Sequence, residues 1–338
     1  DDPEGPSVAS YVRKMCLLPS LYPPGEGPVT YCNSGFVVAG RIVEVLTGKT
    51  WQNAVMTHIC RPLAMPAAFA HPQDALRFRC AMGHVSDPKD FHKVVVAPAT
   101  FLAISAAPAG SVLSMSAESL LLFAKAHMAD GTFGDGRRLL SAESARAMRE
   151  AVVDVPPFSI PGITHWGLGW LLGQGPDYPD YGMAGHDGGT LGQYTLLRTF
   201  PEKGVAFTLL TNSPSPAFIR AVESDLAAAL VGATMPQFPP PQAFEPSPER
   251  YIGDYENVGG CIVVRGASGG ELTMTVVSAF PGQPQVTVGL EPYAPDVFAL
   301  RSDNPMHRDQ KACFRDSDSS GRAAFLRLGL RMARRVPG

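Results

Sequence analysis

Hydrophobic positions follow two different periods in the first two thirds of the chain. Before residue 150, apolar residues at helical spacing behind a capping residue predict four helices: 34–46, one capped by Thr50 that ends before Pro62, 116–129, and one capped by Ser141. Strand-like runs then predict strands at 166–172, 178–184, 193–200 and 205–211, the last two paired antiparallel. Ser215 and Pro216 open a closing helix that ends at Gly232.

The last third of the chain has a different composition. Six prolines interrupt residues 235–248 and deny the backbone regular hydrogen bonding, which predicts an extended linker. After it, short alternating runs separated by glycine-rich turns predict an all-β unit. We therefore expect an α/β (α+β) core over residues 1–234, a linker over 235–248 and a small β domain over 249–338.

Composition narrows the classes of function. The chain has 338 residues, a net charge of −3 and 17% charged residues, which is ordinary for a globular protein. A cluster of five arginines near the C-terminus is typical of a solvated strand face, so we expect no nucleic-acid partner. The uncharged run 94–113 contains Pro98, Pro108 and Gly110, which predicts a buried irregular segment and no membrane span.

Cysteine usage and the first residues bear on localisation. The six cysteines form no CxxC pairs and are too sparse for a disulfide-stapled domain, which predicts free thiols in a reducing, cytoplasmic compartment. The acidic start Asp1-Asp2-Pro3-Glu4 has no signal-peptide character and no initiator Met, so it resembles the interior of a loop.

Two short motifs carry the candidate chemistry. Tyr31-Cys32-Asn33 directly precedes a predicted helix, and Gly185-His186-Asp187-Gly188-Gly189 lies 155 residues later among the predicted antiparallel strands. Their order, separation and flanking elements resemble class C β-lactamases, their penicillin-binding-protein relatives, and related esterases and D-aminopeptidases, over residues 28–232. The resemblance implies a β-lactamase-like antiparallel sheet flanked by helices, and a serine hydrolase that needs neither metal nor cofactor.

In that family, the serine of a Ser-x-x-Lys motif attacks an acyl carbonyl, and the tyrosine works with the lysine to move the proton. The resemblance assigns this catalytic role to Tyr31, while Asn33 would orient the lysine and the substrate. A phenol with a pKa of about 10 needs a nearby cation to act as a base at neutral pH. The structural alternatives are a core tyrosine for Tyr31 and a helix N-cap for Asn33.

The second motif replaces the family's Lys-Thr-Gly. The resemblance makes His186 catalytic, Asp187 substrate-orienting, and the backbone N–H of Gly189 an oxyanion-hole donor. Histidine is mostly neutral at pH 7, so it holds a substrate carboxylate less well than lysine does, which favours ester, amide or peptide acyl donors over β-lactams. A plain turn over residues 185–189 is the structural alternative.

Other matches are weaker. Ser86-Asp87-Pro88-Lys89 spells Ser-x-x-Lys, but it follows Tyr31, and its proline and acidic residues suit a surface turn. Cys32 has no histidine near it in sequence to activate a thiol nucleophile. Histidines at 58, 71, 84, 92 and 165 lack the spacing of metal ligands.

The nucleophile is therefore not in this chain. A fold without its central helix would expose a large apolar groove, so we expect an N-terminal fragment carrying Ser-x-x-Lys, either as a separate chain or as residues that precede Asp1. The substrate would be a small-molecule or peptide acyl donor. Alternatives are a catalytically silent binding scaffold and a peptide macrocyclase. The tail resembles a lipocalin-like barrel, chiefly through Tyr251-x-Gly253-x-Tyr255 and Gly329-x-Arg331.

Overall fold

The structure is a computed structural model that describes residues 5–23, 25–87, 90–173, 182–213, 215–279, 285–304, 307 and 310–336. The chain forms two compact units. The sheet unit contains Asp1–Leu17, Cys32–Asp154 and Gly162–Pro236. The barrel unit contains Leu18–Tyr31, Val155–Pro161 and Gln237–Gly338, so two earlier segments join the C-terminal residues.

Serine and threonine caps begin the helices of the sheet unit where the sequence predicts them. The side chains of Thr50, Ser116, Ser141 and Ser215 each accept a backbone N–H from the first turn, which confirms four predicted helix starts. The helices are α1 (Val8–Met15), α2 (Asn33–Thr47), α3 (Trp51–Val55), which continues as a π-helical turn over Met56–Cys60, α4 (Ala117–Met128), α5 (Ala142–Ala147) and α6 (Pro216–Val231). The short helix α1 has no counterpart among the predicted elements.

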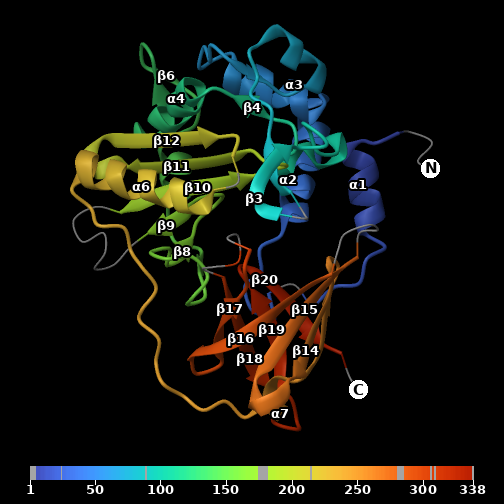
Figure 1. Cartoon of the computed structure of the whole chain (residues 1–338). Helices are drawn as coiled ribbons and strands as arrows, with labels where there is room; N and C mark the ends of the chain where they lie inside the picture. The colour runs from blue at the N-terminus through green and yellow to red at the C-terminus, as the bar shows by residue number, and fades with distance from the viewer. Residues whose placement is uncertain are drawn as a thin grey trace. The chain divides into compact units, whose positions relative to one another are not determined.

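A six-stranded antiparallel sheet forms the centre of the sheet unit. Its order is β12-β11-β10-β9-β8-β7. Leu197 of β11 packs in a cluster with Ala124 of α4, whereas the next residue, Arg198, bonds to Glu223 of α6. Since successive residues of a strand point to opposite faces, α4 and α6 cover opposite faces of the sheet; Figure 1 shows α6 lying across β10–β12. The strands are β7 (Val153–Asp154), β8 (His165–Trp166), β9 (Leu171–Gly173), β10 (Met183–Gly189), β11 (Tyr194–Phe200) and β12 (Val205–Thr211).

The strand prediction for 166–172 was wrong. The backbone turns inside this range, where the Gly167 N–H donates to the Trp170 carbonyl at 2.8 Å and Gly169 adopts a φ of 93°. Only glycine adopts that conformation readily, so β8 and β9 form a hairpin instead of one strand. Most of the predicted strand 178–184 lies outside the described residues, and β11 and β12 match their predictions.

The run 94–113 is only partly the buried irregular segment that the sequence predicts. Its first residues belong to β3 (Asp90–Val96), which pairs with β2 (His84–Asp87), and Val94 and Val96 are exposed. A 3-10 helix over Ile104–Ala109 follows. Two further small ladders complete the unit: β1 (Ala68–Phe69) with β4 (Ser114–Met115), and β5 (Thr132–Phe133) with β6 (Arg137–Arg138).

Helix α2 has its predicted position, but several of its apolar side chains are exposed. It ends at Gly48 with a φ of 64°, the expected left-handed C-cap. Its side chains Ile42, Val45 and Leu46, which recur at helical spacing, are 54%, 65% and 80% exposed. Val37 supplies the buried contact instead. An apolar stripe of α2 therefore has no cover within the described part of the chain.

The barrel unit confirms the predicted all-β tail. Eight antiparallel strands close on themselves, because β20 pairs with β13 through Tyr255↔Arg335 and Glu256↔Arg334. A core of aromatic and aliphatic side chains fills the interior, including Tyr251, Phe298 and Phe314. The short helix α7 (Pro248–Tyr251) precedes the strands β13 (Gly253–Asn257), β14 (Gly260–Gly266), β15 (Leu272–Ser278), β16 (Val286–Ala294), β17 (Val297–Arg301), β18 (Lys311–Ser317), β19 (Ala323–Leu328) and β20 (Arg331–Arg335).

No described helix combines the length and the apolar character that crossing a bilayer requires.

Candidate active site

Strand β10 carries three of the predicted site residues. His186, Asp187 and Gly189 lie in register with Leu197, Leu196 and Tyr194 of β11, so the motif is a strand and not the turn considered as its alternative. The ladder with β9 covers only Met183 to Gly185. Within the described part of the sheet, β10 therefore has a strand neighbour on one side only from Asp187 to Gly189.

His186 lies on the face of the sheet that α4 covers, since it is opposite Leu197. Its ring meets the Trp166 ring edge-on, with 5.7 Å between the centroids. Its Nδ1 lies 2.6 Å from the carbonyl oxygen of Asp187, a contact in which Nδ1–H donates. When the imidazole carries a single N–H, that hydrogen bond leaves Nε2 as its acceptor nitrogen.

Asp187 points to the opposite face, where it meets a buried arginine. The Asp187 carboxylate accepts hydrogen bonds from both terminal nitrogens of Arg198, at 2.5 and 3.3 Å. Arg198 is 4% exposed, and its Nε donates to Glu223 Oε1 of α6 at 2.7 Å; Glu223 itself is 6% exposed. Burial raises the pKa of Glu223, although the Arg198 guanidinium opposes the shift. One arginine thus joins the motif strand to α6 through two carboxylates.

The two glycines at the end of β10 are not required by packing inside the chain. A Cβ at Gly188 would meet Thr195 Cβ at 3.6 Å, and one at Gly189 would meet the Tyr194 ring at 3.5 Å, both ordinary contacts. Gly185 differs, because a Cβ there would lie 2.3 Å from the Leu197 carbonyl oxygen. Gly188 and Gly189 therefore leave open backbone where a ligand can approach closely.

Asn33 is the first residue of α2, with an exposed side chain. The N-cap is Cys32, so the alternative that made Asn33 the cap was wrong. Tyr31 belongs to the barrel unit, where its backbone N–H donates to the Leu330 carbonyl at 2.8 Å. The Arg331 guanidinium lies 5.8 Å from the centre of the half-buried Tyr31 ring.

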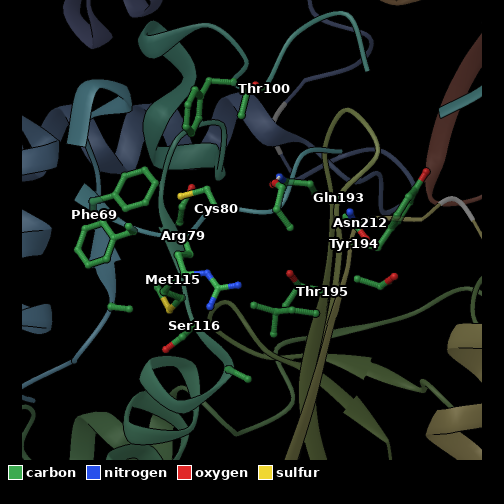
Figure 2. Close-up of a pocket in the computed structure, with 18 residues that line it drawn as sticks. Phe69, Arg79, Cys80, Thr100, Met115, Ser116, Gln193, Tyr194, Thr195 and Asn212 are labelled. Carbon is green, nitrogen blue, oxygen red and sulfur yellow. Dashed lines mark hydrogen bonds between the residues drawn. The ribbon is translucent and has the colours of Figure 1, made fainter. Parts of the chain in front are cut away.

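A cavity of about 400 Å³ lies beside the start of β11 and the end of β12 within the sheet unit. Tyr194, the register partner of Gly189, is part of its wall, and burial raises the pKa of the Tyr194 phenol, which stays protonated at neutral pH. Figure 2 shows Arg79 pointing into the cavity from the side of Met115 and toward Thr195. The remaining wall is mostly apolar or hydroxylic and includes Ala67, Phe69, Phe78, Cys80, Thr100, Phe101, Ser114, Ser116, Leu210 and Thr211.

Sequence reasoning missed most of these cavity residues. Ser116 was recognised only as a helix cap, a role it does perform, because its Oγ accepts the Ser119 N–H at 3.2 Å. Arg79 sits in a segment without periodicity, so no pattern signals it. Ser86 lies on β2 and not at a helix start, while Pro88 and Lys89 lie outside the described residues. Among the described residues, no cluster of His, Cys, Asp and Glu has the composition of a metal site.

Comparison with known proteins identifies the family of the chain. Residues 1–232 match the Beta-lactamase family. Penicillin-binding protein 4 of Amycolatopsis lactamdurans is 38% identical over 250 residues, which are 70% of this chain and 62% of that protein. The chain thus spans less than two thirds of that relative's length.

Solved structures agree on the fold. A structure of SurE with D-Leu superimposes with a TM-score of 0.75 and 26% identity, covering 98% of this chain and 73% of SurE. The octameric penicillin-binding protein homologue from Pyrococcus abyssi is more distant, with a TM-score of 0.53 and 20% identity over 93% of this chain and 66% of its own. The matched residues 1–232 contain Tyr31-Cys32-Asn33 and the β10 motif. The chain therefore belongs to the Beta-lactamase family of penicillin-binding-protein-like serine hydrolases.

Proposed function

We propose that this chain is the larger part of a serine hydrolase or acyl transferase that acts on ester, amide or peptide bonds through an acyl-enzyme. The nucleophilic serine and its lysine come from an N-terminal segment that precedes these residues. Tyr31 relays the proton between nucleophile and leaving group, and Asn33 orients the lysine and the substrate carbonyl. The Gly189 N–H stabilises the negative charge that develops on the carbonyl oxygen.

The end of β10 is the observation that carries this proposal. Its backbone extends beyond β9 toward Gly189, and the two terminal glycines leave space that no side chain of the described residues needs. An extended acyl substrate can pair with such a strand edge and place its carbonyl oxygen on the Gly189 N–H. His186 contributes an imidazole beside this edge, where the family has a lysine.

We do not expect Asp187 to contact the substrate directly. Its carboxylate is already bound to Arg198, and it points to the α6 face, opposite to His186. We infer that Asp187 orients the substrate indirectly, by fixing the position of β10 against α6. The negative charge of Glu223 on the other side of Arg198 completes this support.

Three features of the sheet unit support a missing N-terminal segment. Strand β12 ends the sheet with no further strand beside it in the described residues. The stripe of Ile42, Val45 and Leu46 on α2 is uncovered, and the cavity beside Tyr194 is largely apolar. Edge strands and contiguous apolar surface mark places where another chain or segment binds. A strand and a buried helix bearing Ser-x-x-Lys would occupy these positions.

The acyl donor is proposed to contain a D-amino acid residue. This follows from the likeness to SurE, whose structure was solved with D-Leu. The choice is testable with N-acetyl-D-leucyl and N-acetyl-L-leucyl thioesters, given to the enzyme completed by its N-terminal segment. We expect the D-donor to have the higher kcat/KM.

Tyr31→Phe tests the proposed function itself. Removing the proton relay is expected to lower kcat for the D-donor by about 100-fold or more. Cys32→Ser is the matched control, since it changes the neighbouring exposed residue and removes the only thiol between the two motif residues. The proposal fails if Tyr31→Phe retains wild-type kcat while the completed enzyme is folded, or if Cys32→Ser abolishes turnover.

A further inference from the structure

Two buried rings with polar atoms meet where α4 lies against the β8–β9 hairpin. His127, near the end of α4, is 3% exposed, and its ring meets the Trp170 ring edge-on with 5.2 Å between the centroids. Trp170, just before β9, is 4% exposed and packs in a core cluster with Ala124 and Leu197. Both rings are therefore shielded from solvent inside the sheet unit.

Arg149, which follows α5, joins this pair of rings. Its Nη2 donates to Asp130 Oδ1 at 2.6 Å, and the Asp130 backbone N–H donates to the His127 carbonyl at 3.2 Å. The carbonyl of Met148, one residue earlier, accepts the N–H of Leu168 in the hairpin turn at 3.1 Å. Burial, with the Arg149 charge, lowers the pKa of His127 to about 4, which puts the guanidinium within electrostatic reach of the ring.

Each of these three residues has a buried polar atom that lacks a hydrogen-bond partner in the described part of the chain: His127 Nδ1, Arg149 Nη1 and Trp170 Nε1. They are three of the five such side-chain atoms among the described residues, so the shortage is concentrated in one place. Buried polar atoms are almost always paired. Guanidinium and indole N–H groups donate and cannot accept, so they cannot satisfy each other and need an added acceptor.

The charge of the cluster favours an anion as this acceptor. Arg149 and Arg146 bind the same carboxylate, that of Asp130, at 2.6 and 2.7 Å, so the two guanidinium groups exceed it by one positive charge. Glu150, the next residue along the chain, is exposed and therefore screened by solvent. The His127 ring supplies a third donor when its proton is on Nδ1.

We propose that His127, Arg149 and Trp170 form a buried binding site for a small monovalent anion of about the size of chloride. The three N–H groups coordinate the ion, and the guanidinium supplies the opposite charge. The Phe123 ring centroid lies 4.5 Å from that of His127 and 6.1 Å from that of Trp170. This close packing of rings restricts the ligand to a small ion.

The ion links three segments: the end of α4, the residues after α5, and the β8–β9 hairpin. Trp166, on the other arm of this hairpin, meets the His186 ring with 5.7 Å between the centroids. An anion bound to Trp170 therefore supports the hairpin against which His186 packs. The site is distinct from the acyl-transfer residues and does not depend on their proposed roles.

A chloride titration of the natural protein tests the proposal, with sodium gluconate keeping the ionic strength constant. Because a ligand bound only by the folded state stabilises it saturably, the fluorescence-detected urea midpoint of the sheet unit should rise and level off with chloride. Trp170→Phe keeps an aromatic ring but removes the N–H donor. It should weaken chloride binding by about 10-fold, the effect of one hydrogen bond to a charged group. Trp51 and Trp166 still report unfolding in this variant.

Trp166→Phe is the matched control, since it makes the same substitution in the same hairpin and should leave the response to chloride unchanged. Crystals of the wild-type protein grown with bromide give an independent measurement, because anomalous scattering locates the ion. We expect one bromide within hydrogen-bond distance of His127 Nδ1, Arg149 Nη1 and Trp170 Nε1. A midpoint that does not respond to chloride, equal chloride affinities of wild type and Trp170→Phe, or a water molecule in place of bromide would each overturn the proposal.

Discussion

The two units of this chain bury their sheets to different extents. In the barrel unit each strand has two neighbours and the interior is filled by aromatic and aliphatic side chains. In the sheet unit, β12 is an edge, α2 displays Leu46 and Val45, and a cavity lies beside Tyr194. The barrel thus encloses its own core, whereas the sheet unit leaves an edge strand and apolar surface of the kind that binds another segment.

Removing a large side chain from the barrel core tests whether the barrel unfolds independently of the sheet unit. Phe314 is 3% exposed and contacts the rings of Tyr251, Tyr255 and Phe298. Phe314→Ala should lower the free energy of unfolding of the barrel by about 3–5 kcal/mol. All three tryptophans lie in the sheet unit, so tryptophan fluorescence reports only that unit, while far-UV circular dichroism reports both. Urea unfolding should show an earlier dichroism transition with an unshifted fluorescence transition; a matching shift in fluorescence would contradict independent units.

Arg198→Met should destabilise the sheet unit and leave the barrel unchanged. The substitution leaves Glu223 buried without its partner and frees Asp187, which should cost about 3 kcal/mol of sheet-unit stability because a buried carboxylate loses its counter-charge. Here the fluorescence transition should move and the barrel transition should not. The double variant Arg198→Met with Glu223→Leu should recover much of the loss, and the absence of any recovery would show that Glu223 is not the source of the cost.

The sheet unit should also respond to acid through His127. Burial, with the nearby Arg149 charge, lowers the pKa of His127 to about 4. The unfolded state then binds more protons between about pH 4 and 6.5, so stability rises with pH across that window and is lost as pH falls, by up to about 3 kcal/mol. His127→Gln should flatten this dependence in the fluorescence-detected urea midpoint. An equally steep profile in that variant would assign the effect to another group.

The prediction with the smallest effect on stability concerns the exposed apolar stripe of α2. Leu46 is 80% exposed on α2, so Leu46→Ser should change the stability of the isolated chain by less than about 0.5 kcal/mol. In the enzyme completed by its N-terminal segment the same change should weaken association by about 10-fold, because the leucine is then buried. Leu76→Ser, at a residue that is 93% exposed outside α2, is the control and should affect neither measurement. Equal effects of Leu46→Ser in both states would show that α2 meets no partner.

Local chemistry explains which elements were predictable. Helix starts at Ser116 and Ser215 follow from side-chain capping, which needs no tertiary information. The strand at residues 185–189 was expected from the family resemblance and not from the apolar pattern, which predicted a strand only over 178–184. The single strand predicted over 166–172 failed because Gly169 allows a turn that apolar periodicity does not record. The burial of α2 could not be judged from spacing, because spacing states which residues share a face and not whether anything covers it.

The sequence predicted which site residues share one strand, but not which residues from other parts of the chain lie beside them. His186, Asp187 and Gly189 share β10, as expected, but their opposite faces emerge only from the register with β11. The partner of Asp187 is Arg198, eleven residues away on the next strand, and the cation beside Tyr31 is Arg331, which comes from the other end of the sequence. Long-range pairs of this kind are set by sheet topology, which a single sequence does not specify.

The central claim is that a serine from an N-terminal segment completes this site, and covalent labelling tests it most directly. The natural protein is treated with a fluorophosphonate probe, digested, and the modified peptide identified by mass spectrometry. We expect one labelled serine, in a Ser-x-x-Lys sequence that precedes Asp1, and loss of labelling when that serine is changed to alanine. Labelling of a residue within these 338, or no labelling of a folded and complete protein, would contradict the account.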